Sequence, residues 1–431
     1  MPQPDIGQLT ARVDALRPEL IRVLSDLVRI PTVHAPPRGA EKKGQEYLAV
    51  EFRKLGLEPD LYDIDRVPGV RTHPLRHEPH DIRDRWNLAI KIPGTGGGRS
   101  LICNGHMDTV PPSEFPWKRD PFKPVMEEGR LYGLGSCDMK ASLAIMYILA
   151  RILRESGVRL RGDLILESVC DEEDGGAHGT IAQRLRGYHA DAALALESSA
   201  LSIFNMHKGG YFPEVRLEEA AAGINLNKEM IPQLPRMLHT YLREIEELSK
   251  IRSAAVKIPP EYQHQQQPVP VWICKIVSGL WGKSVPVAIA NQVQIFVYLQ
   301  TVPGEPFELV RNQFQEWNSG LSRKYPELFP KPPAFEFTLR QMEPSFVPFD
   351  HPLVTTLARS IEEQTGARPK IQGSPAPCDM FAFNNHFNIP CVWFGPGGAN
   401  AHAPDEYVEL DSVIHCVKCL LRFVGNWCGW A

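Results

Sequence analysis

A histidine and an aspartate stand two positions apart in the stretch CNGHMDTVPP, residues 103–112. The apolar run before them predicts a short strand, and residues i and i+2 of a strand point to the same face. His106 and Asp108 are therefore expected to leave that strand side by side. A metal-bound imidazole commonly donates its second ring N–H to a carboxylate or carbonyl, which fixes its tautomer. The pair indicates a metal ligand oriented by an aspartate, and the alternative is a surface histidine beside a strand-end aspartate.

Further polar side chains follow apolar runs or glycine-rich turns in the same way. Asp138 lies between a glycine-rich turn and a predicted helix, and Glu172 and Glu173 follow one predicted strand. Glu197 follows another strand, and His402 lies in a glycine-rich loop after the strand CVWFG. Two histidines with several carboxylates form a ligand set that suits zinc, cobalt or manganese. Any single carboxylate is more commonly a solvated loop charge or a helix cap, so the prediction rests on their shared position.

The elements that must position these groups alternate between helical and strand patterns as far as about residue 204. Helices are predicted at about 8–28, 41–55 and 138–157, with strands at WNLAIKI, SLICNGH, DLILESV and DAALALE. Short apolar strands separated by helices predict an α/β fold with a mostly parallel sheet. In such sheets ligands bind beyond the carboxyl ends of the strands, which is where the polar groups fall.

The pattern changes at about residue 205 and returns at about 339. Between these points lie a long predicted helix, a Gln-rich loop and the strands VWICKIVSGL and NQVQIFVYLQT. We therefore predict a catalytic domain in two parts, 1–204 and 339–431, with a smaller α+β lid or dimerisation domain inserted at 205–338. The strand segment VQIFVYLQ carries no charge that would block an open edge, so we expect a homodimer or larger homo-oligomer. An edge capped by the domain's own helix is the alternative.

Composition excludes several classes of protein. The 431 residues carry a net charge of −4, which argues against binding to nucleic acid or to a membrane surface. No apolar run is long enough for a membrane span, and the N-terminal amphipathic helix lacks the apolar core of a signal peptide. Nine cysteines, mostly within apolar runs, fit reduced thiols in a cytoplasmic enzyme. Cys416 and Cys419 form a CxxC within a helical pattern and are predicted to pack in the core.

The segment RTHPLRHEPHDIRDRW, residues 71–86, is polar and contains three histidines. We predict a surface loop here, because the segment has no apolar periodicity. A histidine-rich metal site is the alternative, although the segment has no pattern of acidic partners.

In chain order, GHMDTVP, the stretch WKRDPF…GLGSCDMK, DEEDGG and GPGGANAHAPDE resemble the M20 family of metallohydrolases. That family includes acetylornithine deacetylase, succinyl-diaminopimelate desuccinylase, aminoacylase and carboxypeptidase G. The resemblance covers nearly the whole chain, apart from part of the inserted domain. It implies one or two divalent ions per subunit (Zn, Mn or Co), bound by His106, Asp138, Glu173, Glu197 and His402, with Asp138 as the bridging ligand. It also implies that Asp108 orients His106 and that Glu172 is the general base for a metal-activated water.

The inserted domain departs from the family pattern. Family members follow its first strand with a histidine that steadies the oxyanion of the tetrahedral intermediate, and then with a G-x-N-A motif. Here EVRLEEAAAGINLNKEMIPQL retains Gly223, Ile224 and Asn225 without the histidine, and His207 and His239 lie outside the motif. An oxyanion-hole donor is typically worth about 2.7–4 kcal/mol in the transition state, so its loss is expected to weaken amide hydrolysis.

Three functions follow from this comparison. The first is hydrolysis of a C–N bond in a small carboxylate-bearing molecule, as by a deacylase or dipeptidase. The second is hydrolytic deamination of an activated aromatic amine such as 5-nitroanthranilate, where charge spreads into the ring and the histidine is dispensable. The third is a non-catalytic relative that binds a ligand, against which the retention of Glu172 and of all five ligand positions argues. The missing histidine predicts that ordinary N-acyl amino acids are poor substrates.

Overall fold

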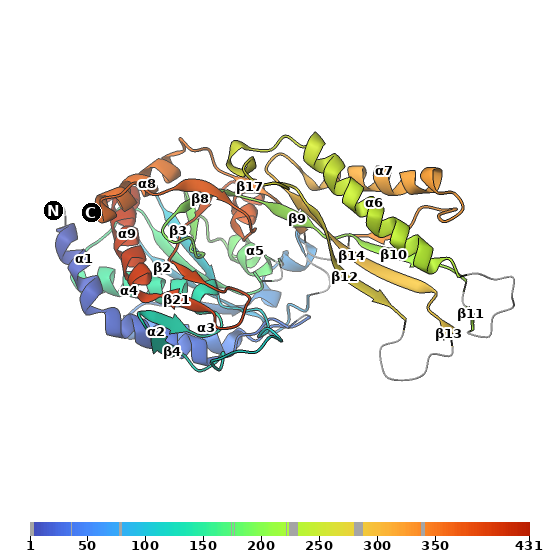
Figure 1. Cartoon of the computed structure of the whole chain (residues 1–431). Helices are drawn as coiled ribbons and strands as arrows, with labels where there is room; N and C mark the ends of the chain where they lie inside the picture. Colours follow the sequence, from blue (N-terminus) through green and yellow to red (C-terminus); the bar gives the residue numbers. More distant parts are fainter. Residues whose placement is uncertain are drawn as a thin grey trace. The chain divides into compact units, whose positions relative to one another are not determined.

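The chain folds into two compact units in the computed structural model (Figure 1). The structure describes residues 4–35, 37–76, 80–173, 175, 177–220, 222–223, 232–279, 288–337 and 341–431. Unit 1 comprises Met1–Met206, Ser345–Ser374 and Cys378–Ala431, and unit 2 comprises His207–Pro344 and Pro375–Pro377. The divisions therefore fall at 206/207 and 344/345, where the sequence predicted 204/205 and 338/339.

Unit 1 is built on a nine-stranded sheet. Its strands are β1 (Asp60–Asp63), β2 (Trp86–Ile92), β3 (Leu101–His106), β6 (Leu164–Val169), β7 (Ala193–Ala195), β8 (Ile203–His207), β17 (Ser345–Phe346), β18 (Ile371–Ser374) and β19 (Cys391–Trp393). The strand order is β1-β2-β6-β3-β7-β19-β8-β17, and β18 pairs with β8. The four central strands β6, β3, β7 and β19 run parallel, while β2 and β8 flank them antiparallel. The predicted parallel core of the sheet is thus confirmed.

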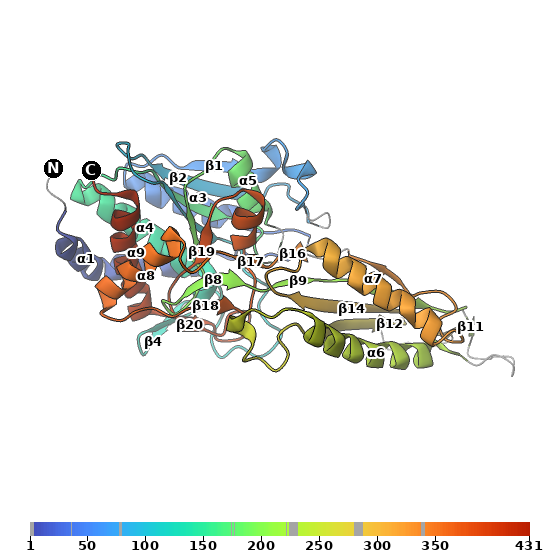
Figure 2. The same cartoon turned by 90° about the horizontal axis from the view of Figure 1, so that it is seen from above.

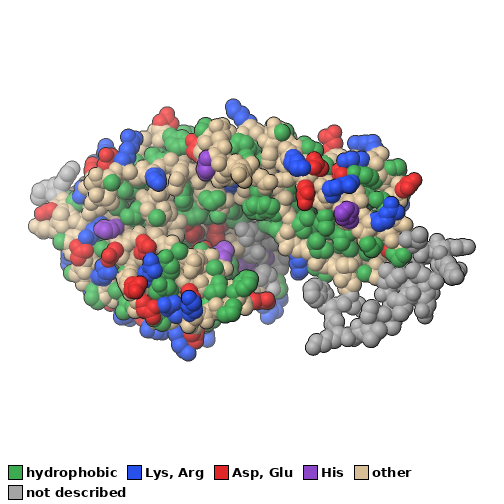
Figure 3. All heavy atoms as spheres, viewed as in Figure 1, with side chains coloured by type: hydrophobic (Ala, Val, Ile, Leu, Met, Phe, Trp, Pro, Cys, Tyr) green, Lys and Arg blue, Asp and Glu red, His purple; other side chains and the backbone are tan. Residues whose placement is uncertain are grey.

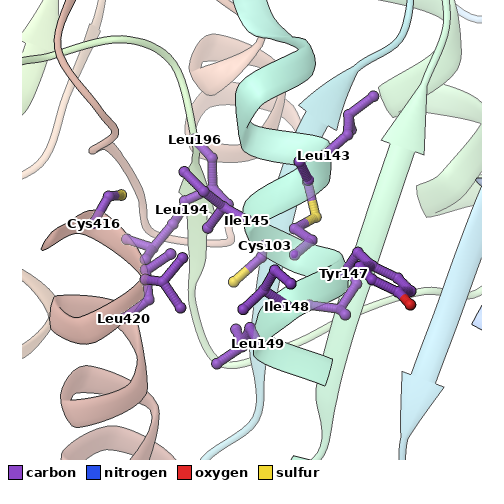
Figure 4. Packing of buried hydrophobic residues seen from close by; sticks show 14 of the residues in the cluster. Cys103, Leu143, Ile145, Tyr147, Ile148, Leu149, Leu194, Leu196, Cys416 and Leu420 are labelled. Carbon is purple, nitrogen blue, oxygen red and sulfur yellow. The ribbon is translucent and has the colours of Figure 1, made fainter. Parts of the chain in front are cut away.

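Helices cover both faces of this sheet because its central strands are apolar on both sides. In β3, Leu101 and Cys103 enter the main core, whereas Ile102 packs on the opposite face with Phe383. The helices that contribute to the main core are α1 (Ile6–Ala15), α2 (Arg17–Arg29), α3 (Lys42–Lys54), α4 (Ala141–Ser156), α8 (Pro352–Thr365) and α9 (Leu410–Cys428). Helix α5 (His178–Leu185) packs on the other face through Ala182. Figure 4 shows side chains of α4 meeting those of β7 and α9 in the main core.

The predicted helix at 8–28 is in fact two helices, which meet at Leu16. The physical reason is Pro18 in the first turn of α2, since a proline has no N–H to donate and its ring clashes with the carbonyl four residues earlier. Helix α4 ends at Ser156, and Gly157 closes it with a left-handed φ of 68°, as the sequence predicted.

A small four-stranded sheet joins two loops that the sequence separates widely. Its strands are β4 (Val125–Glu127), β5 (Arg130–Tyr132), β20 (Gly398–Ala399) and β21 (Tyr407–Glu409), in the order β20-β21-β5-β4. The hairpin β4–β5 precedes the turn that carries Asp138, and His402 lies between β20 and β21. Pairing of β21 with β5 therefore brings these two residues into the same region.

Unit 2 contains a six-stranded antiparallel sheet with two long helices, α6 (Leu234–Ala255) and α7 (Phe307–Lys324), on one face (Figure 2). Its strands are β9 (Gly209–Tyr211), β10 (Glu214–Glu218), β12 (Val271–Ser278), β14 (Gln292–Thr301), β15 (Ala334–Glu336) and β16 (Gln341–Met342). Alternate residues of β14, such as Val293 and Ile295, pack with both helices in one core. Two further short strands, β11 (Ala222–Gly223) and β13 (Ala288–Ile289), pair with each other.

The prediction that VQIFVYLQ forms an open edge is wrong. This segment lies in β14, which pairs with β12 on one side and with β10 and β9 on the other. The alternation of apolar residues indicates that a strand has a buried face, but it does not reveal the neighbours of that strand. Among the described strands, β12 pairs only with β14, so β12 is one edge of this sheet, while β15 and β16 lie on the other side.

The segment 71–86 is also not simply a surface loop. His80 and Arg85 are 7% and 1% exposed, because their partner is a buried carboxylate and not the solvent.

Cys416 and Cys419 are buried in α9, as predicted. No helix within the described ranges combines the length and the apolarity that a membrane span needs. Acidic and basic side chains are interspersed on the face shown in Figure 3, in keeping with the small net charge.

Candidate metal centre

The predicted ligands lie on loops at the carboxyl ends of the central strands. His106 is the last residue of β3, and Glu173 and Glu197 follow β6 and β7. Asp138 lies in the turn just before α4, and His402 lies in the loop that follows β19 and β20. Parallel strands end at the same edge of a sheet, so residues far apart in sequence meet there.

These five residues form two candidate ligand groups that share Asp138. In the first group, His106 Nε2 lies 3.0 Å from Asp138 Oδ1 and 3.5 Å from Glu197 Oε1. In the second, His402 Nε2 lies 3.1 Å from Asp138 Oδ2 and 2.8 Å from Glu173 Oε2. Nitrogen and oxygen ligands bind a divalent ion at about 2.0–2.2 Å, which leaves neighbouring donor atoms about 3 Å apart. The donor set therefore fits two divalent ions, with one oxygen of Asp138 directed to each group.

The geometry refines the role expected for Asp108. The nearest partner of His106 Nδ1 is the main-chain carbonyl of Asp108 at 2.9 Å, whereas the Asp108 carboxylate oxygen Oδ1 lies 3.8 Å away. The other carboxylate oxygen accepts the backbone N–H groups of Glu172 and Glu173, both at 3.1 Å. Asp108 thus orients the histidine through its backbone and holds the two glutamates through its side chain.

Glu172 lies beside the ligand groups without belonging to either. Its Oε2 is 3.8 Å from His106 Nε2, and its side chain is buried. Burial raises the pKa of Glu172 well above its ordinary value, and the nearby Glu197 carboxylate adds to this effect. A carboxyl group with a raised pKa is suited to accept and return a proton near neutral pH.

The electrostatics of the five ligands reflect several buried acids around two imidazoles. Burial favours a neutral Asp138, but hydrogen bonds from His106 and His402 hold its pKa well below the ordinary value. Hydrogen bonds to Asp138 and Glu173 raise the pKa of His402 to about 11. Burial would lower the pKa of His106, yet Glu197 and Asp138 raise it well above its ordinary value. Without a metal, protons on the histidines supply the positive charge that the acids require.

Sequence reasoning did not identify two further carboxylates that border this centre. Glu406 accepts the backbone N–H groups of Gly135, Cys137 and Asp138 at 2.8–3.0 Å, so it holds the turn that carries the shared ligand. Its signal in the sequence is its place in AHAPDE, four residues after His402. Asp379 accepts a hydrogen bond from Thr180 at 2.5 Å, and burial raises its pKa to about 7. No pattern in the sequence marks Asp379.

Comparison with known proteins places the chain in a family. The model for peptidase family M20/M25/M40 matches residues 102–426. The chain belongs to this family. It is accordingly a metallohydrolase that acts on C–N bonds, with candidate ligand groups for two ions.

Two curated relatives align with almost the whole chain. One is the N-formyl-4-amino-5-aminomethyl-2-methylpyrimidine deformylase of Bacillus subtilis, 27% identical over 98% of both chains. Another is the acetylornithine deacetylase of Shigella sonnei, 22% identical over 95% of this chain and 98% of the relative. Among solved structures, the dipeptidase Dug1p of Saccharomyces cerevisiae has a TM-score of 0.77 at 14% identity, over 98% of both chains. A dinuclear metal-binding M20 peptidase of Bacillus subtilis has a TM-score of 0.61 at 16% identity, over 95% of this chain and 98% of that chain. These structures share the fold.

We expect metal binding to release protons, with an affinity that rises with pH. The raised pKa values of His106 and His402 keep both imidazoles protonated in metal-free protein near neutral pH, and only neutral imidazole binds a metal. Titration of chelator-treated protein with Zn²⁺ should therefore release at least two protons per chain, from these two residues and from the ligand acids whose pKa values are also raised. Calorimetry in buffers of different ionisation enthalpy measures this number. Each released proton should strengthen binding about tenfold per pH unit.

The variant His402→Gln serves as the comparison, because it should bind fewer ions and release fewer protons. An affinity that does not change between about pH 6 and pH 8 would contradict the expectation.

Proposed function

We propose that this chain removes a short acyl group from an amine nitrogen of a small molecule, in a reaction that depends on divalent metal. The observation that carries the proposal is the complete ligand set that shares Asp138, with Glu172 beside it and outside both ligand groups. A chain that had lost catalysis would not be expected to retain the ligands together with the buried acid next to them.

The five ligands would divide between two ions. His106, Glu197 and Asp138 would hold one, and Asp138, Glu173 and His402 the other. A mixed imidazole and carboxylate set suits Zn²⁺, Mn²⁺ or Co²⁺. Ions bound there polarise the carbonyl of the scissile amide and lower the pKa of water towards neutrality.

Glu172 would move the proton in this reaction. Its carboxylate takes a proton from the attacking water and returns it to the leaving nitrogen, which must be protonated before the C–N bond breaks. Its neighbour Glu173 serves as a ligand, since adjacent side chains after a strand point in different directions. Asp108 supports both roles, because its carboxylate accepts the backbone N–H groups of both glutamates.

The two curated relatives suggest the acyl group more clearly than they suggest the amine. Their names describe removal of a formyl group and of an acetyl group, so a short acyl group on nitrogen is common to both. The amines differ, because one is an aminomethylpyrimidine without a carboxylate and the other is an amino acid. The expected substrate carboxylate stays a prediction.

Hydrolytic deamination of an activated aromatic amine is the second candidate. It is favoured by the sequence from Lys208 to Leu238, which contains no histidine where the family's oxyanion histidine is expected. Part of this stretch, residues 221 and 224–231, lies outside the described residues. Displacement on an electron-poor ring spreads charge through that ring and has less need of an oxyanion donor.

We expect a substrate panel to separate these candidates. The panel holds an N-formyl aminomethylpyrimidine, N-acetylornithine, a dipeptide and 5-nitroanthranilate, each assayed with enzyme reconstituted with Zn²⁺, Mn²⁺ or Co²⁺. The proposal expects kcat/KM of about 10⁴ M⁻¹s⁻¹ or more on at least one of the two acyl amines. The difference in kcat/KM between the two acyl amines shows whether the substrate needs a carboxylate. Turnover of 5-nitroanthranilate with neither acyl amine hydrolysed would favour the second candidate.

Substitution of the two adjacent glutamates should have different effects on metal content. Glu172→Gln removes the proton acceptor but keeps the shape, so kcat should fall by about 10²–10⁴ while two ions remain bound. Glu173→Gln should lose one ion, because an amide is a poorer ligand than a carboxylate. Metal analysis and kinetics on both variants provide the measurement. Near-normal turnover by Glu172→Gln would rule out its proposed role.

The homodimer proposal rests on the edge strand of unit 2. Trp272 and Ile276 of β12 are 52% and 39% exposed, and among the described strands β12 pairs only with β14. An exposed apolar edge is normally covered or paired, and pairing with a second copy gives a closed twofold interface. A second copy of this chain is therefore the partner that we propose for β12.

Light scattering at micromolar concentration should give twice the chain mass of 48.4 kDa. Trp272→Glu should shift the protein to the monomer, because it places a charge within the apolar edge. Ile251→Glu is the control, since Ile251 is also an exposed apolar side chain, at 57%, but lies on helix α6 and not on the edge strand. A monomeric wild-type protein at micromolar concentration would exclude the dimer.

A further inference from the structure

Three histidines and an arginine converge on one buried carboxylate next to the catalytic glutamates. Asp171 is fully buried and directly precedes Glu172 and Glu173. Its Oδ1 lies 2.9 Å from Arg85 Nη1, 2.9 Å from His80 Nδ1 and 3.5 Å from His34 Nε2. Its Oδ2 is hydrogen-bonded to His178 Nδ1. All four partners are buried, and none belongs to the two ligand groups of the metal centre.

The backbone at Asp171 adopts a conformation that side chains normally avoid. Its φ is +67°, in the left-handed region that non-glycine residues adopt uncommonly. This residue lies between the end of β6 and the two glutamates, so its backbone angles set the direction in which both side chains leave the strand. Because the backbone of a non-glycine residue prefers a negative φ, the contacts of the Asp171 side chain are expected to hold this turn.

The two glutamates are held from the opposite side by Asp108, whose carboxylate accepts both of their backbone N–H groups. His34 lies between the two aspartates, with Nε2 3.5 Å from Asp171 and Nδ1 4.0 Å from Asp108. Both buried carboxylates therefore act on the same short stretch of backbone.

A third metal ion is the competing interpretation, since His34, His80 and Asp171 have the spacing of a ligand group. The charges argue against it. The guanidinium of Arg85 already contacts the oxygen of Asp171 that both histidines approach, and Glu41 holds that guanidinium through Nε at 2.9 Å. A divalent ion on this oxygen would lie next to a permanent buried positive charge.

We propose that Asp171 is a positioning residue for the reaction, whose contacts with Arg85 and His178 hold the left-handed turn that directs Glu172 and Glu173. The inference rests on the proposed function for the role of Glu172. It concerns metal binding through Glu173, which can be measured without any substrate.

The test compares Asp171→Asn with Asp84→Asn. Asparagine keeps the size of aspartate and tolerates a positive φ, so the first variant removes mainly the charge. Asp84 is the matched control, because it also has a positive φ of 55° but its side chain is 69% exposed. Both proteins are loaded with Zn²⁺ or Co²⁺ for measurement of ion stoichiometry, affinity, the Co²⁺ visible spectrum and the melting temperature.

Asp171→Asn should weaken the binding of one ion about 10–100-fold and alter the Co²⁺ spectrum, as expected for loss of a residue that orients a ligand. With an identified substrate, kcat should fall by a similar factor and KM should change little. Asp84→Asn should leave all of these quantities unchanged. A purely structural role would lower the melting temperature and leave the affinity and spectrum of the folded protein unaltered, which would overturn the proposal.

A second pair keeps the test decisive if Asp171→Asn does not fold. His178→Asn retains an N–H donor for Asp171 and should preserve the metal affinity, whereas His178→Leu removes the donor and should weaken it. Equal affinities in the two His178 variants would overturn the proposal. The proposal would also be overturned if the wild-type protein bound three ions per chain and Asp171→Asn bound one fewer. The cluster around Asp171 would then be a metal site. A failed substrate panel changes none of these readouts, so the two proposals fail independently.

Discussion

The active region depends on one partly buried carboxylate that two histidines share. Asp138 directs one oxygen to His106 and the other to His402, and each imidazole contacts a further acid, Glu197 or Glu173. Buried acids at this density are strongly unfavourable without compensating positive charge. Protons on the imidazoles provide that charge in the metal-free protein, and divalent ions provide it more effectively. The repulsion among these acids is therefore relieved when metal binds. This relief favours strong metal binding.

Two loops of this centre are held by carboxylates that lie outside the ligand groups and accept backbone N–H groups. Glu406 holds the turn at Asp138, and Asp108 holds the backbone of Glu172 and Glu173. Asp171 lies directly before those glutamates with Arg85 and His178 around it. Precise placement of ligands thus comes from buried polar contacts that the hydrophobic core alone does not provide.

The long-range topology explains why the centre needs the complete unit 1. The parallel strands β3, β6 and β7 end together, which joins His106 to the acids that follow the neighbouring strands. The small sheet formed by β5 and β21 brings His402 to Asp138 across more than half of the chain. Unit 2 is a separate compact body, interrupting unit 1 in sequence while leaving its core continuous.

The sequence by itself determined the parallel α/β core, and it brought out the five candidate metal ligands and the glutamate proposed as general base. Strand ends can be recognised from apolar runs, and parallel strands collect their ends at one edge, so His106, Glu173 and Glu197 followed from local pattern together with the family resemblance. Only the tertiary structure decided which strand of unit 2 lies at the edge, because apolar alternation is the same in β14 as in an edge strand. It also decided that His80 and Arg85 are buried and that the Asp108 carboxylate contacts backbone N–H groups. A charged residue is buried when a partner compensates its charge, and that partner can lie many residues away in the sequence. The residues next to it in the sequence therefore do not reveal whether it is buried.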